Sequence, residues 1–207
     1  VENIYHLAAR PSVPFSIEHP QLAYRANHQS TLSLIEAATA HGAKSIVFSS
    51  SSAVYGDEPT LPKHEDCTLA PMSPYADHKL AGEQALAASS LSTVALRYFN
   101  VFGPKQDPSS PYSGVISLFS KWASESAAAN VVGDGLQTRD FVFVDDVVSA
   151  NLLATTYANA NQGSMVINVA TGNAITILEL WQKVCDICDF EGAPFNYLPS
   201  REGDIRE

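Results

Sequence analysis

The stretch that decides the fold begins Ser49-Ser50-Ser51-Ser52-Ala53-Val54-Tyr55-Gly56 and ends Ser73-Pro74-Tyr75-Ala76-Asp77-His78-Lys79. Directly before it, the short apolar run Lys44-Ser45-Ile46-Val47-Phe48 predicts a strand. The serines therefore stand at the carboxyl end of that strand, which is where open α/β sheets bind their ligands. The stretch predicts a ligand site on an α/β sheet.

The second half of the stretch predicts a helix that begins at Ser73-Pro74, with a hydroxyl at the N-cap and proline at the first helical position. Tyr75 then falls in the first turn, and Lys79 follows four residues later on the same face. A cation ~6 Å from the phenol, at an effective dielectric of ~20, favours the phenolate by about 2.8 kcal/mol. The pKa of Tyr75 would then fall from about 10 to near 8, which suits a general base.

Composition narrows the class of protein. The chain has 207 residues, is 45% hydrophobic and carries a net charge of −10. An acidic surface argues against nucleic acid or an anionic membrane as a partner. No apolar run approaches the ~20 residues of a membrane span and no signal peptide is visible, so we expect a cytoplasmic protein.

Two patterns could be mistaken for metal sites. Cys185 and Cys188 lie inside an apolar helical pattern without a second pair of ligands, so we expect buried helix thiols. Asp145 and Asp146 open a predicted helix, where acids favour the positive end of the helix dipole. We therefore expect no metal.

The serine-rich strand end, Val-Tyr-Gly and Ser-Pro-Tyr-x-x-x-Lys together resemble the extended short-chain dehydrogenase/reductase family, and within it the nucleotide-sugar epimerases. The resemblance implies an α/β fold: a Rossmann-like parallel sheet with helices on both faces, plus a small C-terminal substrate-binding region. Residues 1–103 would be the later part of the NAD-binding domain. Residues 104–207 would mainly bind substrate, with 139–170 returning to the cofactor domain.

The resemblance also assigns roles to residues, with NAD as the cofactor and a UDP-sugar as the substrate. Ser51, Tyr75 and Lys79 would be catalytic. The cofactor would be bound by Leu7, Ala8, Ala9, Asn27, Ser49, Ser50, Tyr75, Lys79, Tyr98, Phe99 and Val101. The substrate would be bound by Ser12, Ser51, Ser52, Asn100, Val115, Arg139, Arg201 and Asp204.

The glycine-rich turn that places the family's first helix against the cofactor pyrophosphate has no counterpart in this sequence. We therefore expect the chain to lack the first third of the cofactor domain, and its end to lack the last family elements. Without that turn, we expect little turnover from these 207 residues alone.

Elsewhere the pattern predicts a loop over 10–19, a helix over 20–40, a strand over 92–99 and a helix over 114–124. Residues 131–142 resemble a substrate-side hairpin of the family. A strand over 166–169 and a helix over 175–188 complete the prediction. Family dimers pair two helices per subunit into a four-helix bundle, so we also expect a homodimer. Its apolar contacts would include Leu34, Ala38, Leu80 and Leu86.

The reaction is indicated by Ser52 and Ala53. Related sugar 4,6-dehydratases carry an Asp-Glu pair there, because elimination of water needs an acid to protonate the leaving hydroxyl. Decarboxylase relatives also use a glutamate at the position of Ala53. Epimerisation needs neither, so we expect a 4-epimerase of a UDP-hexose or UDP-N-acetylhexosamine that acts through a transient 4-keto sugar.

Gln106-Asp107-Pro108 looks most like the branch that prefers N-acetylhexosamines. Two alternatives stay open: a non-catalytic fragment that binds nucleotide sugar or dinucleotide, and an NADP-dependent nucleotide-sugar reductase of the same fold.

Overall fold

The computed structural model describes residues 1–110, 113–191, 195–199 and 206. The chain divides into two compact units. The first comprises residues 1–99 and 145–169, and the second comprises residues 100–144 and 170–207. Residues 100–103 and 139–144 thus belong to the second unit, whereas the sequence placed them in the cofactor domain.

The first unit is built on a four-stranded parallel sheet in the order β1-β2-β3-β7. The strands are β1 (Asn3–His6), β2 (Ser45–Ser51), β3 (Ser92–Tyr98) and β7 (Ser164–Val169). Most residues of β2 and β3 are buried, as expected for parallel strands covered on both faces. The predicted Rossmann-like parallel sheet is confirmed.

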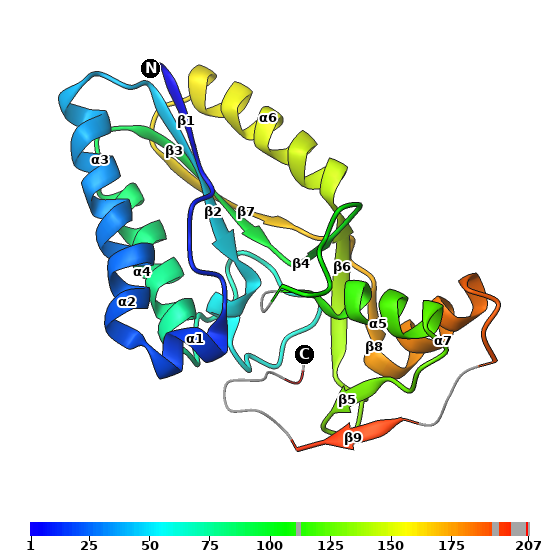
Figure 1. Ribbon diagram of the computed structural model, residues 1–207. Helices are drawn as coiled ribbons and strands as arrows, with labels where there is room; N and C mark the ends of the chain where they lie inside the picture. The colour runs from blue at the N-terminus through cyan, green and yellow to red at the C-terminus, as the bar shows by residue number, and fades with distance from the viewer. Residues whose placement is uncertain (111–112, 192–194, 200–205, 207) are drawn as a thin grey trace. The chain divides into compact units, whose positions relative to one another are not determined.

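Helices cover both faces of this sheet (Figure 1). Helices α3 (Ser30–Ala40) and α4 (Pro74–Ala87) lie on one face, and α6 (Val144–Ala160) lies on the other. Between the sheet and the two helices α3 and α4, a hydrophobic cluster buries residues from the sheet and from both helices. Its buried members are Ala38, Ile46, Phe48, Leu86, Leu91 and Ala95.

One local prediction on this side was wrong. Residues 10–19 are not all loop, because α1 (Val13–Glu18) forms there, with the Ser12 hydroxyl accepting from the Phe15 amide at 3.1 Å. Pro14 sits in the first turn of α1, where a missing N–H costs nothing. The helix predicted over 20–40 is confirmed in its extent, and it consists of α2 (Pro20–Tyr24) and α3 joined by a π-helical segment, η1 (Arg25–Gln29).

The second unit packs α5 (Val115–Ser124) against α7 (Ile177–Ile187) around a core that includes Phe119 and Trp181. One small sheet has the order β4-β6-β8, from β4 (Asn100–Phe102), β6 (Thr138–Phe143) and β8 (Ala174–Thr176). The other pairs β5 (Asn130–Val132) with β9 (Asn196–Leu198).

The predicted hairpin over 131–142 was wrong, since β5 and β6 belong to different sheets. The side chain of Gln137 donates to the Val132 carbonyl at 2.9 Å, so a side chain satisfies a group that a hairpin would pair through the backbone.

The thiol prediction holds for one cysteine only. Cys185 is buried, but α7 ends at Ile187 and Cys188 beyond it is exposed.

Candidate active site

Helix α4 begins as the sequence predicts. The Ser73 hydroxyl accepts from the Ala76 amide at 3.2 Å, and Pro74 is the first helical residue. Tyr75 in this first turn is 9% exposed. Its backbone amide donates to the hydroxyl of Ser16 on α1 at 3.1 Å, a contact that the sequence did not reveal. The first turn of α4, which carries Tyr75, is therefore fixed both by the Ser73 cap and by Ser16 of α1.

Ser51, the last residue of β2, reaches the Tyr75 phenol through a side-chain hydrogen bond. Its hydroxyl also accepts from the Ala53 amide at 3.2 Å, which starts the short 3₁₀ helix η2 (Ser52–Tyr55). Gly56 ends this segment at φ 60°, where an added Cβ would lie 1.8 Å from the Ala70 carbonyl oxygen. The Val-Tyr-Gly motif therefore needs glycine at its last position.

Lys79 lies one turn beyond Tyr75 and is 5% exposed. Its ammonium donates to the Ser49 carbonyl at 2.6 Å and lies 5.8 Å from the Tyr75 ring centroid. Ser51, Tyr75 and Lys79 are thus gathered at the carboxyl end of β2.

The pKa of Tyr75 differs from the sequence prediction. Burial raises the pKa of the Tyr75 phenol, and the hydrogen bond with Ser51 opposes that rise. Burial lowers the pKa of Lys79 to about 8. The predicted fall of the Tyr75 pKa was wrong for the chain alone, because it counted attraction between charges and omitted the removal of both groups from water.

The other serines of β2 point to different faces of the sheet, as successive residues of a strand do. Ser49 forms a side-chain hydrogen bond with Tyr98, whose hydroxyl also accepts from Asn151 of α6 at 2.7 Å. Ser50 faces α4, and its hydroxyl donates to Glu83 at 2.5 Å. Ser50 therefore contributes to the packing of α4 rather than presenting a free hydroxyl.

Leu7, Ala8 and Ala9 follow the carboxyl end of β1. The segment is held by Asn27, which accepts from the Arg10 amide at 2.7 Å and donates to the Arg10 carbonyl at 3.0 Å. The π-helical segment η1 carries Asn27, which is 4% exposed. The structure therefore gives Asn27 a bracing role for the loop after β1.

His6 is a further buried residue that the sequence analysis missed. Its Nε2 lies 2.8 Å from the Thr31 hydroxyl, which itself donates to the Asn27 carbonyl at 2.7 Å. Since the hydroxyl has only one hydrogen, His6 Nε2 must be the donor. Burial and the charge of Lys79 lower the pKa of His6, so a neutral ring carries its hydrogen on Nε2.

In the second unit, Asn100 and Arg139 stand on the neighbouring strands β4 and β6. Asn100 donates to the Asp140 carbonyl at 3.0 Å, and Arg139 donates to the Thr138 carbonyl at 2.7 Å. The Asp140 carboxylate accepts from the Gly172 amide at 2.7 Å, which fixes the loop after β7.

The remaining predicted residues that the structure describes lie elsewhere in the two units. Val101 is in β4 and Val115 opens α5, while the Phe99 amide donates to the Val169 carbonyl at 3.1 Å. Arg201 and Asp204 lie outside the described residues.

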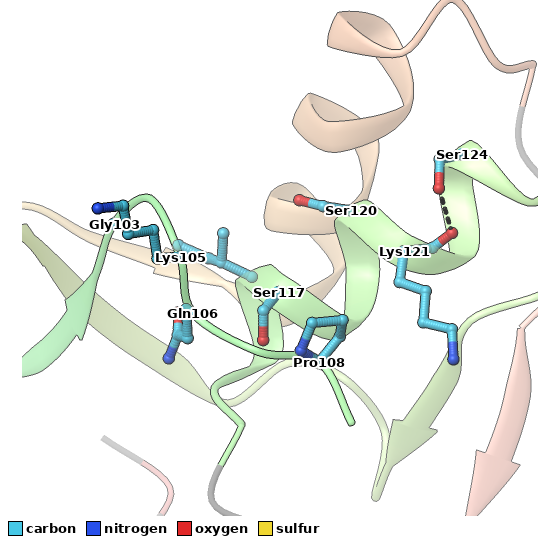
Figure 2. A pocket seen from close by; sticks show the side chains of 9 residues that line it. Gly103, Lys105, Gln106, Pro108, Ser117, Ser120, Lys121 and Ser124 are labelled. Carbon is cyan, nitrogen blue, oxygen red and sulfur yellow. Dashed lines mark hydrogen bonds between the residues drawn. The ribbon is translucent and has the colours of Figure 1, made fainter. Parts of the chain in front are cut away.

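A pocket of about 450 Å³ lies in the second unit between residues 103–108 and α5 (Figure 2). Its lysines, Lys105 and Lys121, extend in different directions, and the Ser117 and Ser124 hydroxyls donate to carbonyls of their own helix. None of the predicted site residues that the structure describes lines this pocket. The pocket therefore does not gather reactive groups around one point.

Two kinds of feature are absent from the described ranges: clusters of metal ligands and membrane-spanning helices. No cluster of three His, Cys, Asp or Glu side chains there is placed to hold a metal ion. In the same part of the chain, no helix is both long and apolar enough to cross a membrane.

Known proteins are similar to this chain in sequence. Residues 1–170 match the model of the NAD dependent epimerase/dehydratase family. The chain is 37% identical over 210 residues to a UDP-glucose 4-epimerase of Mycolicibacterium smegmatis, covering 99% of this chain and 66% of that protein.

Two solved structures are similar along nearly all of this chain. One is a UDP-N-acetylglucosamine 4-epimerase from Methanobrevibacter ruminantium in complex with UDP-N-acetylmuramic acid, with TM-score 0.90, 39% identity and coverage of 99% and 66%. The other is a Thermus thermophilus UDP-glucose 4-epimerase in complex with NAD, with TM-score 0.86, 33% identity and coverage of 99% and 67%. The chain thus spans about two thirds of the length of these relatives.

Proposed function

The chain belongs to the NAD-dependent epimerase/dehydratase family, and we propose that the protein is a 4-epimerase of UDP-hexoses or UDP-N-acetylhexosamines. One observation carries the proposal. The buried Tyr75 phenol is hydrogen-bonded to Ser51, with the Lys79 ammonium one helical turn away, at the carboxyl end of a parallel strand. This arrangement suits removal of a proton from a sugar hydroxyl.

Epimerisation is favoured over dehydration by Ser52 and Ala53 at the start of η2. Neither side chain can protonate a leaving hydroxyl as a carboxylic acid would, so elimination of water lacks its acid at these positions.

The residues near Lys79 fit NAD. The buried ammonium has three hydrogens, and among the described residues its hydrogen bonds reach only the Ser49 carbonyl. Lys79 can therefore also hold ribose hydroxyls. When bound, NAD supplies the acceptance and return of a hydride at the sugar C4.

Tyr75 is proposed to take the proton from the 4-hydroxyl and later return it, while Ser51 holds the 4-oxygen. Because burial raises the pKa of Tyr75, the phenol is neutral at pH 7 in the chain alone. Its action as a base therefore requires added positive charge beside it, which couples proton removal to occupation of the site.

The substrate side would be formed by Asn100 and Arg139, with Arg201 and Asp204. The planar guanidinium of Arg139 suits a diphosphate. Its neighbour Asp140 is bonded to the loop after β7, which gives the strand carrying Arg139 a fixed position. Relatives named for UDP-glucose and UDP-N-acetylglucosamine support a UDP-sugar without choosing between these sugars.

A homodimer through α4 and the helix pair α2–α3 is also proposed, with a changed set of contacts. Ala38 and Leu86 are buried in the core beside Phe48, so they do not face a partner. Leu34 and Leu80 are partly exposed, and Leu22, Tyr24 and Leu32 are exposed. Light scattering at micromolar concentration should show twice the monomer mass, and a monomer would contradict this proposal.

The activity test uses the full protein with NAD and UDP-glucose or UDP-N-acetylglucosamine, followed by chromatography of the products. We expect interconversion with the galacto epimer and no net consumption of NAD, since the hydride is returned. Net oxidation of NADPH would indicate the reductase. Heat of binding on titration with NAD or UDP-sugar, without any turnover, would indicate the non-catalytic binding protein.

A further inference from the structure

A buried ion pair joins α4 to two strands of the sheet. The Arg97 guanidinium on β3 donates through Nε and Nη2 to the two carboxylate oxygens of Glu83, at 3.0 and 2.8 Å. The Ser50 hydroxyl on β2 donates to the same carboxylate at 2.5 Å. Ser50 and Arg97 are 3% exposed and Glu83 is 6% exposed. One carboxylate therefore ties three elements together.

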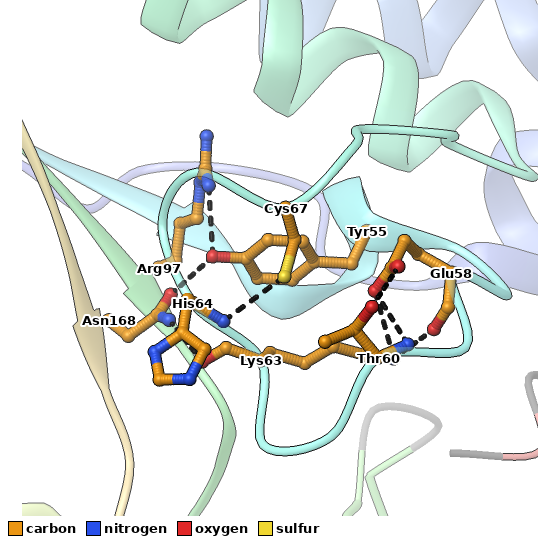
Figure 3. A network of polar contacts seen from close by, with 8 residues as sticks. All are labelled: Tyr55, Glu58, Thr60, Lys63, His64, Cys67, Arg97 and Asn168. Atoms are coloured by element: carbon orange, nitrogen blue, oxygen red, sulfur yellow. Dashed lines mark hydrogen bonds and ion pairs between the residues drawn. The ribbon is translucent and has the colours of Figure 1, made fainter.

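The network continues outward from Arg97 (Figure 3). Arg97 Nη1 donates to the Tyr55 hydroxyl at 2.9 Å, and that hydroxyl donates to Asn168 Oδ1 on β7 at 2.7 Å. Arg97 Nη1 also donates to the Glu65 carbonyl at 3.2 Å. The segment that follows Ser51 is thus fixed to the same guanidinium as α4.

The position of this network matters for the catalytic groups. Glu83 follows Lys79 by four residues and Tyr75 by eight, so the three side chains share the face of α4 that meets the sheet. Ser50, the other partner of Glu83, directly precedes Ser51. The carboxylate thus links the helix of Tyr75 to the strand of Ser51.

The energetics of buried ion pairs favour a positioning role for Glu83 and Arg97 over a stabilising one. Replacing a buried ion pair with apolar side chains of similar volume is often neutral or stabilising, so the pair is a poor way to gain stability alone. Directional bonds to a bidentate carboxylate do, however, fix position. We infer that Glu83 and Arg97 are positioning residues that hold α4 in register with β2, so that Tyr75 stays within reach of Ser51. The inference rests on the proposed function and involves no contact with reacting atoms.

Two substitutions change the geometry of the Glu83–Arg97 pair while keeping its charges. Glu83→Asp keeps the carboxylate but shortens the side chain by one methylene, so it cannot hold both Ser50 and Arg97 unless α4 moves. Arg97→Lys keeps the positive charge but loses the planar fork. In the full protein, each should lower kcat by about 10- to 100-fold, since small misplacements of reacting groups cost that much. The KM for UDP-sugar should stay within about twofold, because neither residue contacts substrate.

A second readout does not depend on turnover. Lysines are labelled with ¹³C-methyl groups, and the Lys79 signal, assigned with Lys79→Met, is followed by NMR as pH rises. Burial puts the pKa of Lys79 at about 8 in the wild-type protein. Displacement of α4 should admit water and move that pKa upward in both variants.

Val94→Ala is the matched control. Val94 is fully buried on β3, and the substitution weakens the core without touching the network. It should lower the melting temperature and leave kcat and the Lys79 titration unchanged. An equal loss of kcat in this control would assign the effect to stability and overturn the inference.

The outcomes are distinguishable. A folded Glu83→Asp or Arg97→Lys protein with the wild-type kcat and Lys79 titration overturns the inference. If one variant does not fold, the other decides. If the wild-type protein does not epimerise UDP-sugars, the proposed function fails, and an unchanged Lys79 titration in the variants would still overturn the positioning role.

Discussion

The Lys79 ammonium lies 4.9 Å from the ring centroid of Phe48, which projects from β2 beneath α4. The face of an aromatic ring attracts a cation, and this contact offsets part of the cost of removing the ammonium from water. Burial nevertheless lowers the pKa of Lys79 to about 8. The contact therefore keeps a cation beside Tyr75 in a position that water barely reaches.

The lowered pKa of Lys79 makes stability depend on pH. The folded-state pKa is about 8 against 10.5 for an ordinary lysine, so the unfolded chain binds more protons between these values. Stability should therefore rise with pH in this window. Between pH 7.5 and 9.5, the wild-type protein should gain about 2 kcal/mol in unfolding free energy relative to Lys79→Met, measured by urea denaturation.

The rise of stability with pH should end near pH 10. The raised pKa of Tyr75 means that the folded state holds its proton longer, so stability should fall at higher pH. For Lys79→Met, the control is Lys44→Met, because Lys44 is exposed and forms a surface ion pair with Glu2. Parallel curves for wild type and Lys79→Met would show that Lys79 titrates normally in the folded protein.

Gly82→Ala should destabilise the protein although alanine is the better helix former. A Cβ at residue 82 would lie 2.8 Å from Cζ of Phe48, and that ring is buried and cannot swing away. The gain of about 1 kcal/mol in helix propensity should be outweighed by overpacking of about 1–3 kcal/mol. Urea denaturation should show a net loss.

Gln84→Ala, on the exposed face of the same helix, is the control for Gly82→Ala. It should leave stability unchanged or slightly increased. Equal or greater stability of Gly82→Ala than of wild type would show that α4 does not need a close approach to Phe48.

The parts of the site that the sequence predicted depend on local signals. Ser73-Pro74 predicts the start of α4 because capping involves residues adjacent in the chain, and the spacing of Tyr75 and Lys79 then follows from helix geometry. The apolar run before Ser49 likewise predicts β2. Because α4 is a regular helix, the four-residue spacing of Tyr75 and Lys79 in the sequence determines their separation in the structure.

The parts that were missed depend on residues far apart in the sequence. Glu83 meets Arg97 only when α4 packs on β3, so no local pattern indicates the pair. The pKa of Tyr75 depends on how much of the phenol is buried, and burial raises it. Strand β5 pairs with β9, and β6 pairs with β4 and β8, so the partners of both strands lie far from them in the sequence.

Arg139→Ala should act mainly on substrate binding. Loss of a hydrogen-bonded charge to a diphosphate costs about 1.5–3 kcal/mol, so KM for UDP-sugar should rise about 10- to 100-fold with a smaller change in kcat. Arg139→Lys should recover only part of the loss, because an ammonium lacks the planar fork. Steady-state kinetics test this.

Lys183→Ala is the control for Arg139, since Lys183 is an exposed cation on α7 in the same unit. A KM that rises as much in this control would indicate a general effect of charge. An unchanged KM in Arg139→Ala would remove Arg139 from the substrate site.

Tyr75→Phe should abolish the base and leave the site otherwise intact. The phenol is the only part of Tyr75 that bonds Ser51, and the backbone contact with Ser16 does not depend on it. Turnover should fall by about 10²- to 10⁴-fold, the usual contribution of a positioned general base. Calorimetry should show nearly unchanged affinity for UDP-sugar, because the removed oxygen acts in proton transfer.

Tyr157→Phe completes this test of the catalytic base. Tyr157 is an exposed tyrosine on α6, so removing its hydroxyl should not alter turnover. If Tyr75→Phe retained more than about a tenth of wild-type turnover, the proton would have to leave through another group, since general-base catalysis contributes far more than that factor. The hydrogen bond between Ser51 and Tyr75 would then orient a ring and take no part in proton transfer.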